Sequence, residues 1–423
     1  MTSLRNIASL VAAITILQLA QGLMGVYLPL AMSADRLQGA AIGFVGAMYS
    51  AGFMAGAWYG PMMLARVGHI RVFSAAAAIV TASTLCLAGA NDAISWGVLR
   101  GIMGFSVAFV FISVDSWMSI SVAREERGGV MGVYQVLTKA ALTLGPFLAF
   151  GAIPGAAGPL MIAGALQALA IVPISLTSKA QPAPPSAQPL ALREQFNVAP
   201  AAVTASFFAG FVNAGVMTLA PLYAVEHFGV AQATTFQAAA FAGSLILQWP
   251  AGKLSDRVDR RLVIAGLSGM AALAAFALAL FGPRLGFAAA AALFALWGAG
   301  ALSFYGLAVA HMADRAEPGR IAQAASGLLF VWAAGSIAGP LLLGLAVEAA
   351  GRNAMFWFAG LSGAALVAFM LYRRTERTQA ETTRKDSMAP ATATSVAAAD
   401  LAYGGEDAPD GIAPPPIEGK GAG

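Results

Sequence analysis

Twelve predominantly apolar stretches, most of them longer than 20 residues, make up the greater part of this 423-residue chain. They cover 7–31, 39–65, 72–90, 94–122, 129–153 and 158–177, and then 198–224, 232–252, 262–281, 285–311, 320–347 and 353–372. About 20 apolar residues suffice to cross the hydrocarbon core of a bilayer as a helix. Hydrophobic residues form 59% of the chain and charged residues only 10%, which excludes a soluble globular domain. We therefore predict an all-α integral membrane protein with 12 transmembrane helices.

A change of composition after Ser178 divides the apolar stretches into two sets of six. The segment 179–189 contains four prolines and cannot continue as a regular helix, so it predicts an extended linker. We expect one six-helix bundle over 1–177, a cytoplasmic Pro-rich linker over 178–195 and a second bundle over 196–372. The charged, Pro-, Ala-, Thr- and Gly-rich segment 373–423 predicts a disordered cytoplasmic tail.

A charged sequence between two apolar stretches recurs after 191 residues. It reads Ala-Arg-Val-Gly-His-Ile-Arg-Val at 65–72 and Asp-Arg-Val-Asp-Arg-Arg-Leu-Val at 256–263. The recurrence indicates that the two halves are duplicated units, which is typical of a transporter.

Basic residues are distributed unevenly between alternate loops. With the amino terminus placed in the cytoplasm, the loops, linker and amino terminus on that side hold thirteen Lys and Arg residues, and the tail adds six. The opposite loops hold only Arg36, Arg284 and Arg352. Because basic residues favour the cytoplasmic side, we predict that both termini are cytoplasmic, in a cell inner membrane. The net charge of +4 is explained in the same way and indicates no nucleic-acid partner.

The second charged loop carries a recognisable pattern. Residues 252–261 match G-x-x-x-D-R-x-G-R-R, with Asp259 at the second Gly position. In the first half the match is weaker, because Ala65 occupies the acidic position, and the residues kept are Arg66, Gly68 and Arg71. This loop resembles the hallmark of the major facilitator superfamily, and the resemblance extends over roughly 7–372. It implies two pseudo-symmetric six-helix bundles around a central cavity that is reached alternately from either side of the membrane.

An acid and an arginine at the end of a helix can form a gate. We expect Asp256 and Arg257 to pair across the interface between the halves in the outward-open state and to separate when the cytoplasmic side opens. Gly252 and Arg260 complete the predicted gate. The alternative is that these basic residues only anchor the cytoplasmic face.

Further sequence elements are similar to superfamily motifs. Arg100 and Gly104 fit an R-x-x-x-G element, and Gly145-Pro146 recurs as Gly339-Pro340 in the eleventh stretch. The complete Gly-Pro element of antiporters also requires glycines that this chain lacks. We therefore expect the Gly-Pro elements to allow close helix packing, and we do not interpret them as a sign of antiport.

Asp115 is an isolated acid in an otherwise apolar or hydroxylated stretch. A carboxylate inside the membrane is costly, which predicts a functional role such as proton transfer. With the fourth and fifth helices joined over 124–129, Asp115 and Lys139 would lie about 13 and 15 Å deep and would pair. A static bridge between two helices is the alternative. Arg100 is roughly 22 Å from Asp115 along the same helix, too far to pair with it.

The sequence Asp115-Ser116-Trp117, followed by a charged loop, is similar to the YcaD-like branch of the superfamily, which has no clear substrate. In this fold the first, second, fourth and fifth helices of each half face the cavity. The resemblance therefore suggests a set of polar cavity candidates, namely Gln18, Gln21, Gln135, Asn213 and Gln237. Each could equally form a hydrogen bond between helices without contacting a solute.

The sequence contains no phosphate-binding loop, no nucleophile elbow and no His or Cys spacing typical of a metal site. We therefore predict no enzyme activity, no cofactor and no metal. The prediction is a monomeric secondary transporter of a small organic solute by alternating access, with proton coupling through Asp115. The alternatives are an uncoupled facilitator and a transporter-shaped receptor or assembly factor that moves no solute.

Overall fold

The computed structural model describes residues 2–121, 124–177, 192–317 and 320–376, and the regular elements in these ranges are all helices. The first half contains α1 (Thr2–Ala34), α2 (Gly39–Val67), α3 (His69–Cys86), α4 (Ala93–Ser121), α5 (Arg124–Leu144), α6 (Gly158–Leu169) and α7 (Ile171–Ser175). The second contains α8 (Leu192–Val198), α9 (Pro200–Phe228), α10 (Val230–Ser255), α11 (Arg260–Phe281), α12 (Phe287–Ala301), α13 (Phe304–Ala313), α14 (Ile321–Ala350) and α15 (Ala354–Glu376). Short 3-10 helices follow α3, α5 and α11, as η1 (Leu87–Gly89), η2 (Gly145–Ala149) and η3 (Gly282–Arg284).

Eleven segments within the described ranges are helical, long and apolar enough to cross a membrane. The sixth of the twelve expected spans combines α6 and α7, and the tenth combines α12 and α13. The twelfth membrane-length helix is α5, whose 21 residues begin with the charged sequence Arg-Glu-Glu-Arg and include Lys139. The all-α membrane fold predicted from the sequence is confirmed.

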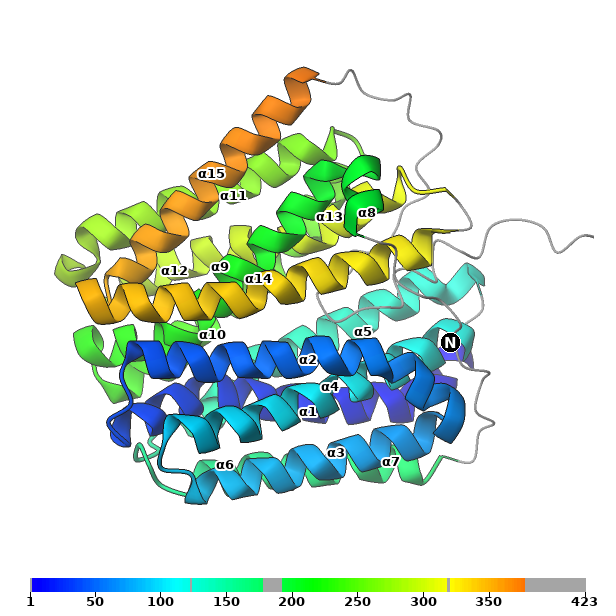
Figure 1. Cartoon of the computed structure of the whole chain (residues 1–423), viewed down its shortest axis with the longest axis horizontal. Coiled ribbons are helices and arrows are strands. Elements are labelled where there is room, and N and C mark those ends of the chain that lie inside the picture. Colours follow the sequence, from blue (N-terminus) through cyan, green and yellow to red (C-terminus); the bar gives the residue numbers. More distant parts are fainter. Residues whose placement is uncertain (1, 122–123, 178–191, 318–319, 377–423) are drawn as a thin grey trace, which may run out of the picture.

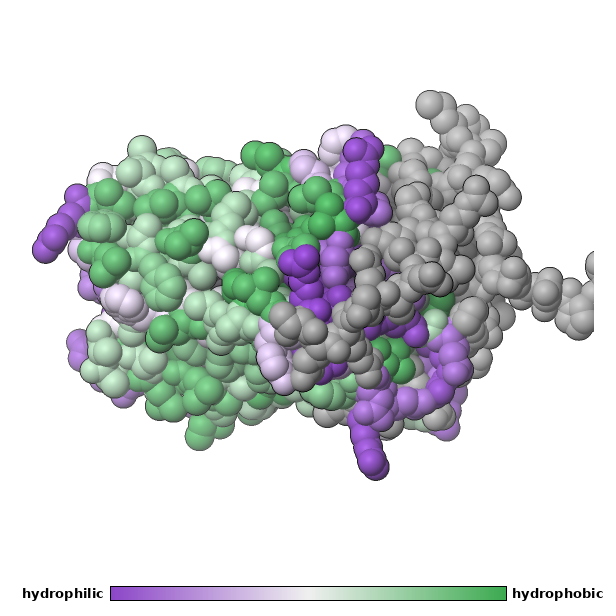
Figure 2. Space-filling view, turned by 90° about the horizontal axis from the view of Figure 1, so that it is seen from above, coloured by the Kyte–Doolittle hydropathy of each residue, from purple (hydrophilic) through white to green (hydrophobic). Residues whose placement is uncertain are grey.

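The long helices run back and forth between two ends of the molecule (Figure 1). We call the end where α1 and α9 begin the linker end, and the opposite end the far end. Figure 2 shows a broad apolar surface between the two ends, with polar side chains gathered toward each of them. A surface of this kind suits a lipid bilayer around the middle of the molecule.

Equivalent helices pack in the same way in the two halves. A Cβ atom at Gly104 of α4 would collide with the α2 backbone at Tyr49, and one at Gly298 of α12 would collide with the α10 backbone at Ala240. In the membrane, small residues let helix backbones approach closely. The same pair of spans, the second and fourth of each half, uses glycine for this purpose.

The two halves meet most tightly at the far end. A Cβ atom at Gly39 of α2 would lie only 2.8 Å from the carbonyl oxygen of Gly344 of α14. Beside this contact, the backbone N–H of Ala40 donates a hydrogen bond of 3.0 Å to a carboxylate oxygen of Glu348. Backbone-to-backbone packing leaves no space for a solute there, so the far end is closed.

Toward the linker end, the same two helices touch through large side chains. The rings of Trp58 and Phe330 lie 5.7 Å apart between centroids, and those of Phe53 and Trp332 lie 6.1 Å apart. Side-chain contacts of this kind hold the backbones farther apart than glycine contacts do. The interface therefore widens from the far end toward the linker end.

The boundaries differ in places from the sequence prediction. Most of the predicted linker falls at 178–191, outside the described residues, but Leu192 begins the short helix α8 and is not part of an extended linker. Helix α15 continues to Glu376, four residues into the predicted tail, and the rest of the tail lies outside the described residues.

Candidate functional site

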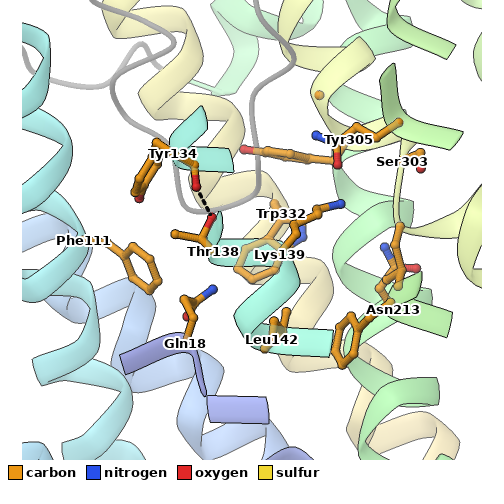
Figure 3. Close-up of a pocket in the computed structure, with 14 residues that line it drawn as sticks. Gln18, Phe111, Tyr134, Thr138, Lys139, Leu142, Asn213, Ser303, Tyr305 and Trp332 are labelled. Atoms are coloured by element: carbon orange, nitrogen blue, oxygen red, sulfur yellow. Dashed lines mark hydrogen bonds between the residues drawn. The ribbon is translucent and has the colours of Figure 1, made fainter. Parts of the chain in front are cut away.

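A cavity of about 230 Å³ lies between the two halves, on the linker-end side of the closed contact. The first half contributes Gln18, Phe111, Tyr134, Thr138, Lys139 and Leu142. The second contributes Asn213, Phe241, Gln248, Leu302, Ser303, Tyr305, Gly306 and Trp332. Figure 3 shows Gln18, Phe111 and Tyr134 on one side of the cavity and Asn213, Ser303 and Tyr305 on the other, with Lys139 between them. Both halves therefore form this pocket together.

The tenth span is interrupted where it lines the pocket. Helix α12 ends at Ala301 and α13 begins at Phe304, and the turn between them contains Leu302 and Ser303. Asn213 of α9 donates a hydrogen bond of 2.9 Å to the Ala301 carbonyl, and the Ser244 hydroxyl of α10 lies 3.4 Å from the Leu302 carbonyl. A broken helix inside a membrane is tolerated where other groups satisfy its backbone, often beside a binding site.

Lys139 is the charged side chain among the described residues that line the pocket. Its Nζ donates a hydrogen bond of 2.6 Å to Ser244 Oγ, which links α5 of the first half to α10 of the second. Among the described residues, Lys139 forms no ion pair. A lysine ammonium between the halves thus relies on a neutral hydroxyl as its side-chain partner.

The predicted pairing of Lys139 with Asp115 is wrong for this structure. Helix α4 ends at Ser121 and α5 already begins at Arg124, whereas the prediction placed the connecting loop over 124–129. Asp115 therefore lies about 9 Å from the end of α4, whereas Lys139 lies about 22 Å along α5, at 1.5 Å per residue. The two groups are at different depths and cannot meet.

Asp115 is fully buried and accepts a hydrogen bond of 3.2 Å from the Tyr134 hydroxyl. Because Tyr134 also lines the pocket, one side chain connects the buried carboxylate with the cavity. The neighbouring Ser116 hydroxyl lies 3.1 Å from Nε2 of the buried His69, whose ring packs edge-on against Trp117. The acid-Ser-Trp sequence thus ties the linker end of α4 to α3 and α5.

Arg100 lies outside the pocket, within the first half. Its guanidinium group is 4.1 Å from the centroid of the Tyr49 ring, and the Tyr49 hydroxyl accepts a hydrogen bond of 2.8 Å from Gln21. A cation over an aromatic face is a favourable contact inside a protein. Arg100 and Gln21 therefore connect α4 and α1 to α2 and do not border the cavity.

The other polar candidates separate into two groups. Gln18 and Asn213 line the pocket. Gln135 and Gln237 are buried but do not line it, and Gln237 donates a hydrogen bond of 3.2 Å to the Met217 carbonyl. For Gln237, the alternative role of a hydrogen bond between helices fits the geometry.

The gate residues of the second half form a cluster at the linker end. Arg260 is buried and pairs with Asp256 at 3.3 Å and with Asp314 at 2.7 Å. Arg257 is exposed. Asp256 thus pairs within its own half, so its predicted pairing across the interface in the outward-open state stays a prediction. Gly252 accepts a backbone hydrogen bond from Asp256, at the end of α10.

Asp259 begins α11 beside this cluster. Burial alone would raise the pKa of its carboxyl group, but the hydrogen bonds from Arg261 lower the pKa below its usual value. Its carboxylate accepts from the Arg261 backbone N–H at 2.9 Å and pairs with the Arg261 guanidinium at 2.8 Å. This residue, which departs from the glycine of the loop pattern, therefore caps the helix.

The weaker gate pattern of the first half forms a different turn. Gly68 adopts a φ of 88° between α2 and α3, a conformation that favours glycine, and Arg66 and Arg71 are exposed. His69 occupies the position that Arg260 holds in the second half. It contacts Ser116, whereas Arg260 pairs with Asp314. The two halves therefore differ in how the third helix is fixed to the fourth.

The repeated Gly-Pro elements are sites of close packing. A Cβ atom at Gly145 would collide with the α1 backbone at Leu19, and one at Gly339 with the α9 backbone at Phe211. In both halves the fifth span thus packs on the first through this glycine.

The two prolines differ in their surroundings. Pro146 is the second residue of the 3-10 helix η2 after α5, whereas Pro340 lies inside the continuous helix α14. A Cβ atom at Gly43 of α2 would collide with the Pro340 carbonyl, so the second element also takes part in the far-end contact between the halves.

Several pocket residues could not be identified from the sequence. Ser303 and Tyr305 are ordinary members of apolar stretches, and no charge or motif distinguishes them. The same holds for Ser244, which does not line the pocket but bonds to Lys139 beside it. Tyr134 lies one position before the candidate Gln135 and occupies the pocket in its place. Their roles depend on helix rotation and on the break in the tenth span.

Comparison with known proteins agrees with this architecture. The family model described as Major Facilitator Superfamily matches residues 10–326 and, again, 203–404. The chain is 25% identical over 372 residues to YcaD of Salmonella dublin, an uncharacterized MFS-type transporter, and the match covers 84% of this chain and 92% of that protein. The resemblance to YcaD-like proteins is thereby confirmed.

Solved structures show the same fold. The nucleoside transporter NupG superposes with a TM-score of 0.69 at 15% identity, over 86% of this chain and 98% of NupG. A D-xylose-proton symporter superposes with a TM-score of 0.70 at 15% identity, over 86% and 96% of the two chains. The chain belongs to the Major Facilitator Superfamily and is a multi-pass membrane transporter protein, not an enzyme.

Proposed function

We propose that this protein moves a small organic solute across the membrane by alternating access and that the pocket around Lys139 is the solute site. The observation that carries the proposal is that both halves line one pocket, while the far end beside it is closed. A solute bound there touches both halves at once. Its binding energy can therefore favour one arrangement of the halves over the other.

The pocket belongs to the state that faces the linker end. Several of its residues lie in the middle or linker-side part of their helices: Tyr134 is ten residues into α5, and Gln248 is seven residues before the end of α10. The excess of Lys and Arg in the linker-end loops favours a cytoplasmic linker end. On this assignment the protein faces inward.

Proton coupling through Asp115 is the second part of the proposal. The carboxylate is fully buried, and Tyr134 extends from it to the pocket. A change in the protonation of Asp115 would alter its hydrogen bond with Tyr134 and thereby the wall of the solute site. A buried ionisable group this close to a cavity is typical of a proton relay.

The test uses purified protein reconstituted into vesicles that contain a pH-sensitive dye. A compound that raises the melting temperature of the protein is added outside, and its entry and the internal pH are recorded together. We expect entry to be accompanied by a change of internal pH. Asp115→Asn should abolish the pH change while the compound still binds. Glu317→Gln, which alters an exposed acid at the linker end of the other half, should leave the pH change intact.

Other outcomes would separate the alternatives. Entry of the compound without any change of internal pH, in both wild type and Asp115→Asn, would contradict coupling and favour a facilitator. Binding without entry would contradict transport and favour a receptor or assembly factor. Solute-linked proton movement that is unchanged in Asp115→Asn would exclude Asp115 as the proton carrier.

A further inference from the structure

The charge in the pocket comes from one side chain. Among the described residues that line it, Lys139 is the only lysine or arginine, and none is an aspartate or glutamate. The other two charged residues of the membrane-spanning helices that were candidates for the cavity do not line it. Asp115 is hydrogen-bonded to Tyr134 behind the pocket wall, and Arg100 lies over the Tyr49 ring. A solute that enters the pocket therefore meets a positive site.

A neutral hydroxyl is a weak counterpart for this cation. Ser244 Oγ accepts the hydrogen bond from Lys139 at 2.6 Å, and its own hydroxyl proton is directed to the Leu302 carbonyl, 3.4 Å away. Partly buried ammonium groups are stabilised mainly by negative partners. An anion at this position would supply the charge that the described residues do not.

The opposite wall offers hydrogen-bond acceptors. The side-chain oxygens of Asn213 and Ser303 are buried and have no partner among the described residues. The Asn213 amide nitrogen is already used on the Ala301 carbonyl, so the free function of Asn213 is to accept. A hydrogen-bond donor on the solute, such as a hydroxyl group, would satisfy these oxygens.

The rest of the wall is mostly apolar, although Gln18, Thr138 and Gln248 also belong to it. Phe111 and Leu142 come from the first half, and Phe241 and Trp332 come from the second. Aromatic and aliphatic walls bind the apolar body of a ligand, and a few polar groups fix its orientation. The cavity volume of about 230 Å³ limits that body to a small one.

Resting on the transport function proposed above, we propose that the solute is a small organic anion whose carboxylate or similar group binds Lys139 Nζ. Its apolar or aromatic body lies between Phe111 and Trp332, and a donor group faces Asn213 and Ser303. A cationic solute would be repelled by Lys139. A neutral sugar-like solute would leave the charge of the ammonium group uncompensated. Its hydroxyl groups would also face apolar side chains that cannot form hydrogen bonds with them.

This ligand class also links binding to the movement of the halves. The hydrogen bond between Lys139 and Ser244 joins α5 to α10 beside the pocket. A carboxylate on Lys139 makes an ion pair, which is stronger than the bond to a neutral hydroxyl, and it draws the ammonium group away from Ser244 toward the solute. Arrival of the anion therefore weakens one bond between the halves at the moment when the solute itself begins to bridge them.

The experiment is a thermal-stability screen of the purified full chain with matched probes that share one body and differ in charge. The bodies are benzoic, phenylacetic and 3-phenyllactic acid, and each is tested as the carboxylate, the uncharged amide and the corresponding amine. Ligands that bind the folded state raise the melting temperature. We expect stabilisation by one or more carboxylates and none by the amide or amine of the same body. Equal stabilisation by an amide or an amine, or no stabilisation by any carboxylate, would overturn the proposal.

Variants of Lys139 locate the effect. Lys139→Gln should weaken binding of the stabilising carboxylate about tenfold or more, because it removes a charged hydrogen bond. Lys139→Arg keeps the positive charge and should retain part of the affinity. Ser244→Ala removes the hydroxyl that competes for the ammonium group, and this variant should bind the carboxylate at least as tightly as wild type does. Glu317→Gln, at an exposed position outside the pocket lining, serves as the control and should bind the carboxylate as wild type does. Unchanged carboxylate binding by Lys139→Gln would also overturn the proposal. The comparison of carboxylate, amide and amine on the wild-type protein tests the ligand class even if a variant does not fold.

Failure of this inference can be told apart from failure of the transport proposal. A carboxylate that binds through Lys139 but does not exchange across reconstituted vesicles would refute transport and leave the ligand class standing. Exchange of a neutral or cationic solute that binds without Lys139 would refute the ligand class and leave transport standing.

Discussion

Lys139 lies where an ammonium group contributes little to folding. At the level of single residues, its side-chain partner among the described residues is the neutral Ser244 hydroxyl, and it borders an apolar pocket. An ammonium group held in apolar surroundings without a negative partner costs free energy, so its replacement by an apolar residue of similar length should not destabilise the fold. A lysine at such a position is better explained by binding than by stability.

Lys139→Met should therefore leave the melting temperature of the purified protein unchanged or slightly higher, while it abolishes transport of the solute. Thermal unfolding in detergent and uptake by reconstituted vesicles measure the two properties separately. If the melting temperature instead falls by several degrees and transport is lost with it, Lys139 is a structural residue.

The sequence identified Lys139 and Asp115 as unusual but could not pair them correctly. Their types are visible in an apolar stretch, whereas their depths depend on where α4 ends and α5 begins. The charged sequence at 124–127 is typical of a loop, yet α5 starts at Arg124. A shift of a few residues in a helix start moves a side chain by several ångströms along the axis. Residue types were thus predictable, and contacts were not.

Helix contacts in this protein depend strongly on glycine. Gly145 and Gly132 offer a matched comparison, because Gly132 belongs to α5 and Gly145 begins the 3-10 helix that directly follows it. A Cβ atom at Gly145 would collide with the α1 backbone, whereas no atom of the described residues lies within 4 Å of one at Gly132.

Gly145→Ala should destabilise the protein by roughly 1–3 kcal/mol, because the added methyl group has no space. Gly132→Ala should be neutral or stabilise it by about 0.5–1 kcal/mol, because alanine favours a helix. Melting temperatures of the two variants provide the comparison. Equal stability of both would contradict the packing role of the Gly-Pro element and would reopen a role in coupling.

Helices were more predictable than their interruptions. The tenth span appeared in the sequence as one stretch over 285–311, and no proline lies within it. The break at Leu302 and Ser303 is formed by residues that fit a helix equally well, and Asn213 and Ser244 bind the carbonyls there from other helices. Such a feature arises from tertiary contacts, which a local pattern does not contain.

The whole molecule repeats one six-helix plan, and the two halves are distinguishable at the linker end. The duplication was predictable because the charged loop recurs at 65–72 and 256–263. The difference in contacts, with His69 on Ser116 in one half and Arg260 on Asp314 in the other, required the structure. The Asp256–Arg260–Asp314 cluster makes the second half the more strongly charged side of the proposed gate.

Orientation in the membrane is a prediction at the scale of the whole molecule. A fluorescent protein fused after Gly423 should be bright in intact bacteria, and alkaline phosphatase at the same position should be inactive, because we expect the carboxyl terminus to be cytoplasmic. Fusion of the same reporters into the far-end loop after Ala34 should give the opposite pattern. An active phosphatase at the carboxyl terminus would reverse the assignment of the inward-facing state.

The central claim is that the solute pocket communicates with the two sides of the membrane in turn, which requires α2 and α14 to separate at the far end. Ala40 and Glu348 lie in contact there, and both can be replaced by cysteine in a chain whose single native cysteine, Cys86, is changed to serine. A short, reducible bifunctional thiol reagent then joins the two helices.

The measurement is solute exchange by reconstituted Ala40→Cys/Glu348→Cys protein before cross-linking, after it and after reduction, with each single-cysteine variant treated in parallel. We expect the cross-linked protein to retain stabilisation by the solute, to lose exchange, and to regain exchange on reduction. Exchange at an undiminished rate while the far end is held closed would contradict alternating access through this pocket.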